Sequence, residues 1–369
     1  MEYNILVINP GSTSDEIGYF RGDKLLFQQT VRYTPVDLKK FEGKKVTAQY
    51  NFRKNVILRF LEKNSIALKQ IDAVIGRGGL VKPIPGGTYR LNKKLLRDLK
   101  NGVMGDHPSN LGGLLASELA KLGIAKAFIA DPVVVDEMQP LARYSGMPEN
   151  PRLSIFHALN QKRVAKLAAK KLKKKYQQCN FVVFHGGGGI SIGAHQKGRV
   201  IDVNNALDGD GPFTPQRSGG VPSGGLAKMC FSGKYSLKEI KLKIKGMGGI
   251  VSYAGTSDVI SITKFIQTGK KPKNSGIKVN RRQAKEILEA MVYQIAKEIG
   301  AMSTVLKGKV DGIVLSGGLA YSAQILDSLK KYIGWIAPFI IFPGGDEQTA
   351  LKDAALSALK NIKSIKNYS

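Results

Sequence analysis

The chain has 369 residues, 43% of them hydrophobic, and 57 Lys and Arg against 28 Asp and Glu give it a formal net charge of +29. This length exceeds one ordinary hydrophobic core and fits two domains. The longest apolar stretch, residues 332–342, is too short to cross a bilayer, and no signal-peptide pattern opens the chain. The two cysteines, Cys179 and Cys230, form neither a metal-binding spacing nor a disulfide framework. We therefore expect a cytoplasmic protein in a reducing compartment.

The predicted elements of the first half are strands at 4–9, 15–20 and 24–31, a helix near 52–63, a strand at 72–76, helices near 94–101 and 109–121, and a strand at 126–130. The second half is predicted to contain a helix at 154–174, three strands within 181–201, helices near 222–231, 236–244, 257–267 and 281–306, a strand at 311–315, a helix near 321–331, a strand at 338–342 and a last helix near 348–361. Three successive strands followed by helix–strand alternation indicate an α/β sheet of mixed strand direction in each half.

The domain boundary is predicted near 145–153, where the residues SGMPENP interrupt the pattern. We accordingly assign residues 1–150 to a first domain and residues 151–347 to a second. The C-terminal helix, about 348–369, is expected to pack back on the first domain.

Two distant stretches, residues 4–25 and 181–201, follow one pattern: apolar run, loop of tiny residues, apolar run, glycine turn, apolar run. This pattern predicts strand, loop, strand, tight turn and strand in both places. Backbone N–H groups can approach phosphate oxygens where side chains are small. We expect two related halves that each offer a small-residue loop to a nucleotide tail in the cleft between them.

Four small-residue segments follow apolar runs: 9–14 (NPGSTS), 76–79 (GRGG), 185–189 (HGGGG) and 316–319 (SGGL). One glycine pair after a strand is usually only a turn, but four at strand ends, where α/β sheets bind ligands, favour a binding site. None of them is a Walker loop, and no GxGxxG lies between a strand and a helix. These absences argue against a P-loop protein and a dinucleotide-binding protein.

Three of the four histidines, His107, His157 and His185, lie in motif-like loops and lack metal-ligand spacing. Stabilising phosphoryl charge is therefore the favoured role for them, with ordinary structural histidines as the alternative. Arg217, in a segment rich in Gly and Pro, and Arg77, among glycines, suit anion clamps because a guanidinium grips phosphate or carboxylate with two donors. Ordinary surface arginines remain the alternative for both.

Two carboxylates and one basic run complete the candidates. Asp131, at the end of the strand at 126–130, suits the Mg²⁺ of a nucleotide, and Glu347 is a second candidate. The basic run at 162–175 is predicted to form an amphipathic helix, with Val164, Leu167, Ala168 and Leu172 on the buried face and the lysines in solvent. A nucleic-acid-binding helix is the less favoured alternative.

Five runs strongly resemble the acetate and butyrate kinase family of the sugar kinase, Hsp70 and actin superfamily: INPGSTS, GRGGLVKPIPGG, DPVVVDEM, SIFHALNQK and GRVIDVNNALDGDGPFTP. The resemblance extends from about residue 3 to residue 358. It implies an α/β fold of two ribonuclease-H-like domains, duplicated β-β-β-α-β-α-β-α units, around a nucleotide cleft. It also implies ATP/ADP and Mg²⁺ as cofactors and a reversible reaction, butanoate + ATP = butanoyl phosphate + ADP. The partner would be a small carboxylate or acyl phosphate, with no nucleic acid or membrane, and the assembly a homodimer or higher homo-oligomer.

The resemblance assigns roles to residues at matching positions. The catalytic set is Arg217, His157, His185, Asp131 and Arg77. The nucleotide-binding set is Asn9, Gly11, Ser12, Thr13, Ser14, Gly186, Gly187, Gly188, Gly189, Ser316, Gly317 and Gly318. The metal set is Asn9, Asp131 and Glu347, and His107 with Leu80, Val81 and Ile84 would line the pocket for the acid.

The chain also departs from the family pattern. Asp15 and Glu16 stand where the family usually has Thr-Lys, and Gln216 stands where relatives often carry Glu. A reversed charge near a phosphate loop could weaken nucleotide binding, or the side chain could point outward without effect. The departures motivate an alternative hypothesis of a diverged relative that binds nucleotide with weak or no phosphotransfer.

Overall fold

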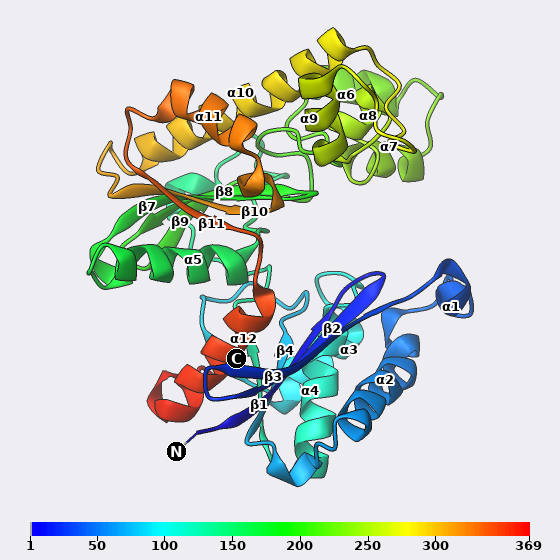
Figure 1. Cartoon of the computed structure of the whole chain (residues 1–369), viewed down its shortest axis with the longest axis vertical. Coiled ribbons are helices and arrows are strands. Elements are labelled where there is room, and N and C mark those ends of the chain that lie inside the picture. Colours follow the sequence, from blue (N-terminus) through cyan, green and yellow to red (C-terminus); the bar gives the residue numbers. More distant parts are fainter. Residues whose placement is uncertain (1) are drawn as a thin grey trace. The chain divides into compact units, whose positions relative to one another are not determined.

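The computed structural model describes residues 2–369, which divide into two compact units (Figure 1). Unit 1 combines the chain up to Asp136 with Asp346–Ser369, and unit 2 is Glu137–Gly345. The boundary precedes the predicted segment because residues 137–152 bond within unit 2. Gln139 N donates to Ile201 O, and Arg152 Nη1 lies 2.9 Å from the Asp202 carboxylate.

Unit 1 is built on a sheet with the strand order β3-β2-β1-β4-β6-β5. Its strands are β1 (Asn4–Pro10), β2 (Ser14–Arg21), β3 (Lys24–Arg32), β4 (Ala73–Arg77), β5 (Thr88–Arg90) and β6 (Lys126–Ala130). Its helices are α1 (Pro35–Lys39), α2 (Tyr50–Lys63), α3 (Lys93–Asn101), α4 (Asn110–Gly123) and α12 (Glu347–Lys360). Both α4 and α12 pack on β1 and β4. Residues 5–8 of β1 are fully buried, as expected of a central strand covered on both faces.

Unit 2 is built on a sheet with the strand order β11-β10-β7-β8-β9. Its strands are β7 (Asn180–Gly186), β8 (Ile190–Gln196), β9 (Arg199–Val203), β10 (Gly312–Gly317) and β11 (Phe339–Pro343). Its helices are α5 (Ala158–Lys171), α6 (Ser223–Cys230), α7 (Leu237–Ile244), α8 (Ile250–Ala254), α9 (Val259–Thr268), α10 (Arg281–Val305) and α11 (Ala323–Ile333). Helix α5 packs on β7 and β10, and α10 packs on β7, β8 and β9.

The two sheets share one topology. In unit 1, β1 pairs antiparallel with β2 and parallel with β4, and β4 pairs parallel with β6. In unit 2, β7 pairs antiparallel with β8 and parallel with β10, and β10 pairs parallel with β11. Each sheet thus has the order third-second-first-fourth-fifth, with β5 as an additional edge strand in unit 1. The predicted duplicated α/β fold with mixed strand direction is confirmed.

The helix predicted at 154–174 differs from the structure at both ends and on one face. It begins at Ala158, with His157 at the N-cap, and ends at Lys171, so Leu172 lies beyond it and is 37% exposed. Lys162 was predicted to face solvent, but it is buried and its Nζ lies 2.8 Å from the Glu137 carboxylate. The short α1, β5 and α8 were not predicted.

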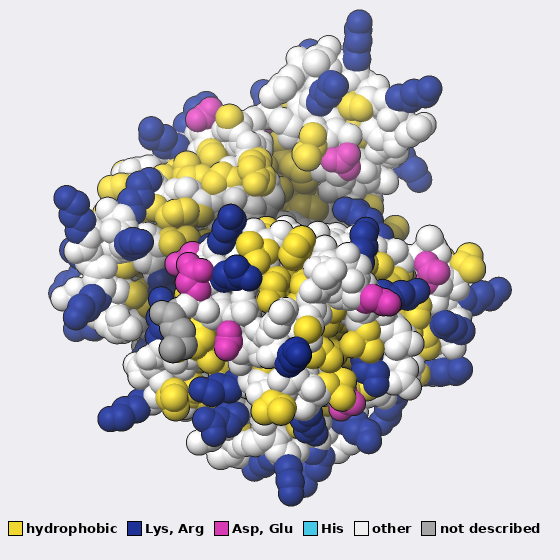
Figure 2. Space-filling view, turned by 60° about the horizontal axis from the view of Figure 1, so that its bottom comes forward, with side chains coloured by type: hydrophobic (Ala, Val, Ile, Leu, Met, Phe, Trp, Pro, Cys, Tyr) yellow, Lys and Arg dark blue, Asp and Glu magenta, His cyan; other side chains and the backbone are white. Residues whose placement is uncertain are grey.

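Positive charge is dispersed over the one face that Figure 2 shows. In the face shown in Figure 2, Lys and Arg side chains are scattered among few acidic ones and do not gather in one patch. Within residues 2–369, no helix has the length and apolar character needed to traverse a bilayer.

Candidate functional site

Three predicted residues from distant parts of the chain meet in unit 1. Asn9 lies near the end of β1, Arg77 ends β4, and Glu347 begins α12. Asn9 Nδ2 donates to Glu347 Oε2 at 2.9 Å, and Arg77 Nη1 lies 2.9 Å from the same oxygen. These side chains meet because β1 and β4 are adjacent parallel strands and α12 packs on both. Asn9, Arg77 and Glu347, together with Glu16, form what we call the β1-end cluster.

Glu16 points into this cluster rather than away from it. It pairs with Asn9 across β1 and β2, and its Oε2 accepts from Asn9 Nδ2 at 3.0 Å. Two carboxylates thus share one amide, beside one guanidinium. Hard oxygen ligands of this kind fit Mg²⁺, which binds through one or two carboxylates and takes its other ligands from water and phosphate. Within residues 2–369, no group of three His, Cys, Asp or Glu is placed to hold a metal by itself.

Asp131 has a different set of contacts. Its Oδ1 accepts from Gly87 N at 2.6 Å, its own N–H donates to Gly87 O, and its φ is +36°. The carboxylate therefore fastens the turn before β5 to the end of β6. A metal-binding role for Asp131 stays a prediction.

The first small-residue loop, residues 9–14, is held in place by a buried ion pair. The side chains of Arg53, from α2, and Asp15, from β2, are 0% and 1% exposed and form a salt bridge. Arg53 Nη1 also donates to Gly11 O at 3.0 Å, and the Tyr33 hydroxyl donates to Asp15. Burial and this hydrogen bond raise the pKa of Tyr33, so the phenol stays the donor. Asp15, noted only as a departure from the family, thus holds the loop in place.

Sequence reasoning missed Arg53. The only available signal was an arginine within the predicted helix at 52–63, a position that normally faces solvent.

In unit 2, two of the predicted histidines stack. The rings of His157 and His185 lie 4.2 Å apart, centroid to centroid, with an interplanar angle of 28°. His185 Nδ1 lies 2.8 Å from Asn160 Oδ1, which also accepts from Ser316 Oγ at 2.7 Å. Asn160, on the first turn of α5, therefore links the loop after β7 to the end of β10. The structure thus brings together residues from the run at 154–162 and from the small-residue segments at 185–189 and 316–319.

The tetraglycine loop packs against Arg217. Thr214 Oγ1 donates to Gly188 O at 2.7 Å, and a Cβ on Gly189 would lie 1.9 Å from Arg217 Nη1. A larger residue at position 189 would therefore force the guanidinium to move away from the loop. Arg217 Nη1 also donates to Ala206 O. Burial lowers the pKa of Arg217, although a guanidinium keeps its charge in proteins.

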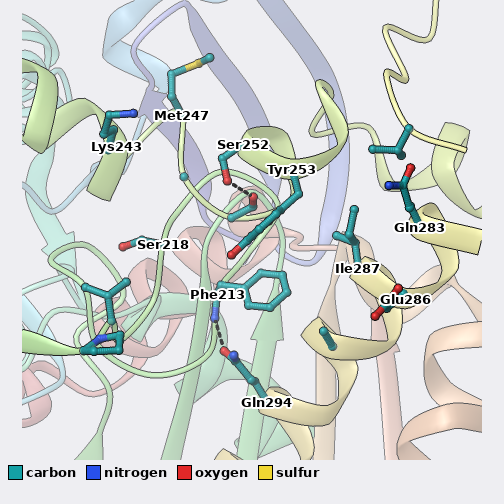
Figure 3. Close-up of a pocket in the computed structure, with 17 residues that line it drawn as sticks. Phe213, Ser218, Lys243, Met247, Ser252, Tyr253, Gln283, Glu286, Ile287 and Gln294 are labelled. Atoms are coloured by element: carbon teal, nitrogen blue, oxygen red, sulfur yellow. Dashed lines mark hydrogen bonds between the residues drawn. The ribbon is translucent and has the colours of Figure 1, made fainter. Parts of the chain in front are cut away.

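Residues 214–217 form the turn that carries Arg217, and a cavity of about 810 Å³ borders this turn. Ser218 lines it directly, and Gly249, also in its wall, is so close to the turn that a Cβ there would lie 1.8 Å from Thr214 O. Figure 3 shows Phe213 and Tyr253 side by side in this cavity, with Phe213 N donating to Gln294 Oε1. The cavity thus borders the turn, and the predicted site residues are not among its lining residues.

Of the residues predicted to line the acid pocket, Leu80 and His107 contact the start of α4. Val81 is fully buried and Ile84 is 7% exposed, whereas Leu80 is half-buried and its N–H donates to Asn110 Oδ1 at 2.7 Å. His107 Nδ1 lies 2.9 Å from Ser109 Oγ. Their role toward a substrate stays a prediction.

The duplicated sheet, with a glycine-rich or small-residue loop after the first strand of each copy, defines a protein of the acetate kinase fold. Two solved structures with this fold are an acetate kinase from Porphyromonas gingivalis (TM-score 0.77, 18% identity, 97% of this chain and 100% of that one) and an acetate kinase from Entamoeba histolytica (TM-score 0.73, 16% identity, 95% and 98%).

The family follows from the sequence comparisons. The model described as "Acetokinase family" matches residues 152–331. A "Probable butyrate kinase" from Elusimicrobium minutum is 55% identical over 369 residues, all of both chains. "Butyrate kinase 2" from Clostridium acetobutylicum is 48% identical over 368 residues, again with full coverage of both. The chain therefore belongs to the acetokinase family, and the resemblance inferred from the motifs is confirmed.

Proposed function

We propose that the protein is a cytoplasmic, ATP-dependent kinase that phosphorylates the carboxylate of a short-chain or branched-chain acid. The reaction is butanoate + ATP = butanoyl phosphate + ADP, and it is reversible. Two relatives named butyrate kinases that match the whole chain support this proposal. The observation that carries it in the structure is the packing of Arg217 on the 186–189 loop. There a cation lies beside a glycine loop in which Gly187 is half-buried and Gly188 is exposed, so positive charge and accessible backbone adjoin, as a phosphoryl group requires.

The chemistry requires positioning rather than a strong base. A carboxylate is already an anionic nucleophile, so the protein must hold it in line with the γ-phosphoryl group and neutralise charge on the equatorial oxygens. In unit 2, Arg217 supplies positive charge and His157 supplies a polarised N–H. The 186–189 loop offers backbone donors.

In unit 1, Asn9, Glu16 and Glu347 are the residues that would hold Mg²⁺. When bound, the ion would neutralise phosphate oxygens as a Lewis acid. Arg77 contacts Glu347 and keeps this carboxylate oriented. An apolar slot separates acids that differ by one methylene by only about 1–3 kcal/mol, so we expect several short acids to react.

Hydroxylamine trapping of acyl phosphate tests the proposal. The protein is incubated with ATP, Mg²⁺ and acids from acetate to valerate, with isobutyrate and isovalerate, and reactions without acid serve as controls. We expect a signal that peaks at four or five carbons. No hydroxamate with any acid, while calorimetry still detects ATP binding, would contradict the kinase and favour a diverged nucleotide-binding relative.

A further inference from the structure

A chain of buried polar side chains in unit 2 leads from the interior to His157. The Tyr176 hydroxyl lies 2.7 Å from His195 Nδ1, and His195 Nε2 lies 3.0 Å from Gln161 Oε1. Gln161 Nε2 lies 2.8 Å from Ser191 Oγ, which lies 2.9 Å from His157 Nδ1. His195, Gln161 and Ser191 are 0% exposed. We call Tyr176, His195, Gln161 and Ser191 the buried relay.

The amide of Gln161 sets the direction of the inner bonds. Its Nε2 lies 3.0 Å from Ser191 O, a carbonyl that can only accept, so this end of the amide is the nitrogen. Gln161 Oε1 must therefore accept from His195, which places a proton on His195 Nε2. His195 Nδ1 then accepts from Tyr176. Complete burial lowers the pKa of His195 well below its usual value, so its ring stays neutral.

The direction of the outer bond follows from the hydroxyl of Ser191. Its oxygen receives one N–H from Gln161 Nε2 and another from the backbone of His157, at 3.4 Å. Both lone pairs are then occupied, so the hydroxyl proton has to be donated. The ring atom within reach is His157 Nδ1, which therefore accepts and leaves the ring proton on Nε2.

We propose that Gln161 and Ser191 are positioning residues that hold His157 as its Nε2–H tautomer. The relay is buried and every bond in it has a fixed direction, so the ring is oriented and its donor nitrogen selected before any ligand binds. The catalytic consequence rests on the proposed function, in which His157 donates to the transferring phosphoryl group. The tautomer itself does not depend on that assignment.

The stacked partner provides an internal contrast. His185 Nδ1 faces Asn160 Oδ1, an acceptor, so His185 carries its proton on Nδ1. The two stacked imidazoles are therefore held as opposite tautomers, one by a serine hydroxyl and the other by an amide oxygen.

Nitrogen NMR of the histidine side chains tests the proposal directly. Long-range ¹H–¹⁵N spectra report which ring nitrogen carries the proton, and the chain has only four histidines, so single substitutions to Gln assign every signal. At pH 8.5, we expect protonated Nε2 in His157 and His195 and protonated Nδ1 in His185. An Nδ1–H form of His157 in the wild-type protein would overturn the proposal without any variant.

The variants link the tautomer to turnover. Ser191→Ala removes the hydroxyl donor, so we expect both tautomers of His157 and a kcat lower by about 10- to 100-fold, with the KM for ATP changed much less. Ser191→Thr keeps Oγ and should restore both readouts. Ser303→Ala is the matched control, because Ser303 is a buried unit 2 serine whose hydroxyl donates to its own helix at Ile299 O.

The outcomes separate this proposal from the proposed function. An unchanged His157 tautomer in Ser191→Ala, or an equal loss of kcat in Ser303→Ala, would contradict the positioning role. The predicted tautomers in a protein that forms no acyl phosphate would contradict the kinase and leave the assignment of the relay standing.

Discussion

The two units have the same sheet topology but carry different chemistry at equivalent strand ends. At the end of β1, unit 1 gathers charged groups: Glu16, Glu347 and Arg77 around Asn9. At the end of β7, unit 2 gathers neutral hydrogen-bonding groups, two stacked imidazoles with Asn160 and Ser316, beside the glycine loop. The fold therefore sets the positions of the strand ends, and the side chains at those ends set the chemistry of each unit. The charged copy suits a cation, and the neutral copy with Arg217 suits a phosphoryl group.

The buried residues that support the two sites also differ in charge. Unit 1 supports its loop with the ion pair of Arg53 and Asp15, whereas unit 2 orients His157 through the uncharged buried relay. A buried charge is strongly destabilising when its partner is removed, and a neutral hydrogen bond costs less. Loss of a support should therefore affect stability mainly in unit 1 and turnover mainly in unit 2.

The largest expected effect is on unit 1 stability. Arg53→Met leaves the Asp15 carboxylate buried without its cation, so the free energy of unfolding should fall by about 3–5 kcal/mol. Urea denaturation measures it. The double variant Arg53→Met with Asp15→Leu removes both charges and should recover most of the loss. A decrease below about 1 kcal/mol in the single variant would show that the pair is not the support inferred here.

A comparable effect on turnover is expected in unit 2. Arg217→Ala removes the guanidinium at the 186–189 loop, and kcat for acyl phosphate formation should fall by about 10²- to 10³-fold. Arg217→Lys keeps the charge but not the fork of donors, and it should recover only part of the rate. Thermal melts of both variants check folding. An Arg217→Ala protein that retains most of its turnover would remove Arg217 from the catalytic set.

The smallest expected effect is a dependence of unit 2 stability on pH. In unit 2, burial and the nearby Asp210 raise the pKa of Glu298 from 4.5 to about 7, although Arg152 opposes the shift. The folded state thus holds this proton more tightly than the unfolded state does. Stability is therefore lost as the pH rises from about 4.5 to about 7, and the loss is constant above that.

Glu298→Gln abolishes this titration. At pH 8, the variant should be more stable than the wild-type protein by about 3 kcal/mol, and at pH 4.5 the two should be nearly equal. Thermal unfolding at both pH values measures the difference. Equal stability of variant and wild type at pH 8 would contradict the raised pKa.

The sequence predicted the repeated elements because each strand has a strong apolar pattern and each loop has small residues. It also singled out Asn9, Arg77, Glu347, His157, His185 and Arg217 as candidates, because they lie in recognisable motifs, and their roles stay predictions. It could not predict Arg53 as a buried support, since burial of an arginine depends on the tertiary partners Asp15 and Gly11. The burial of Lys162 was missed for the same reason, because its partner Glu137 lies outside the helix.

The buried relay could not be predicted from the sequence either. His195 and Ser191 lie on predicted strands but no motif distinguishes them. Gln161 lies in the run SIFHALNQK, but the resemblance gave it no role. Their connection requires the register of β7 and β8 and the packing of α5 on the sheet.

The return of the chain to unit 1 after unit 2 has a consequence for how the protein is made. Helix α12, which begins at Glu347 and packs on β1 and β4, is synthesised only after the whole of unit 2. A ribosome delivers the N-terminus first, so β1 and β4 must wait for more than 200 residues of unit 2 before they receive this covering helix. The β1-end cluster therefore cannot assemble until unit 2 has been synthesised, and the protein gains the Glu347 carboxylate only after that point.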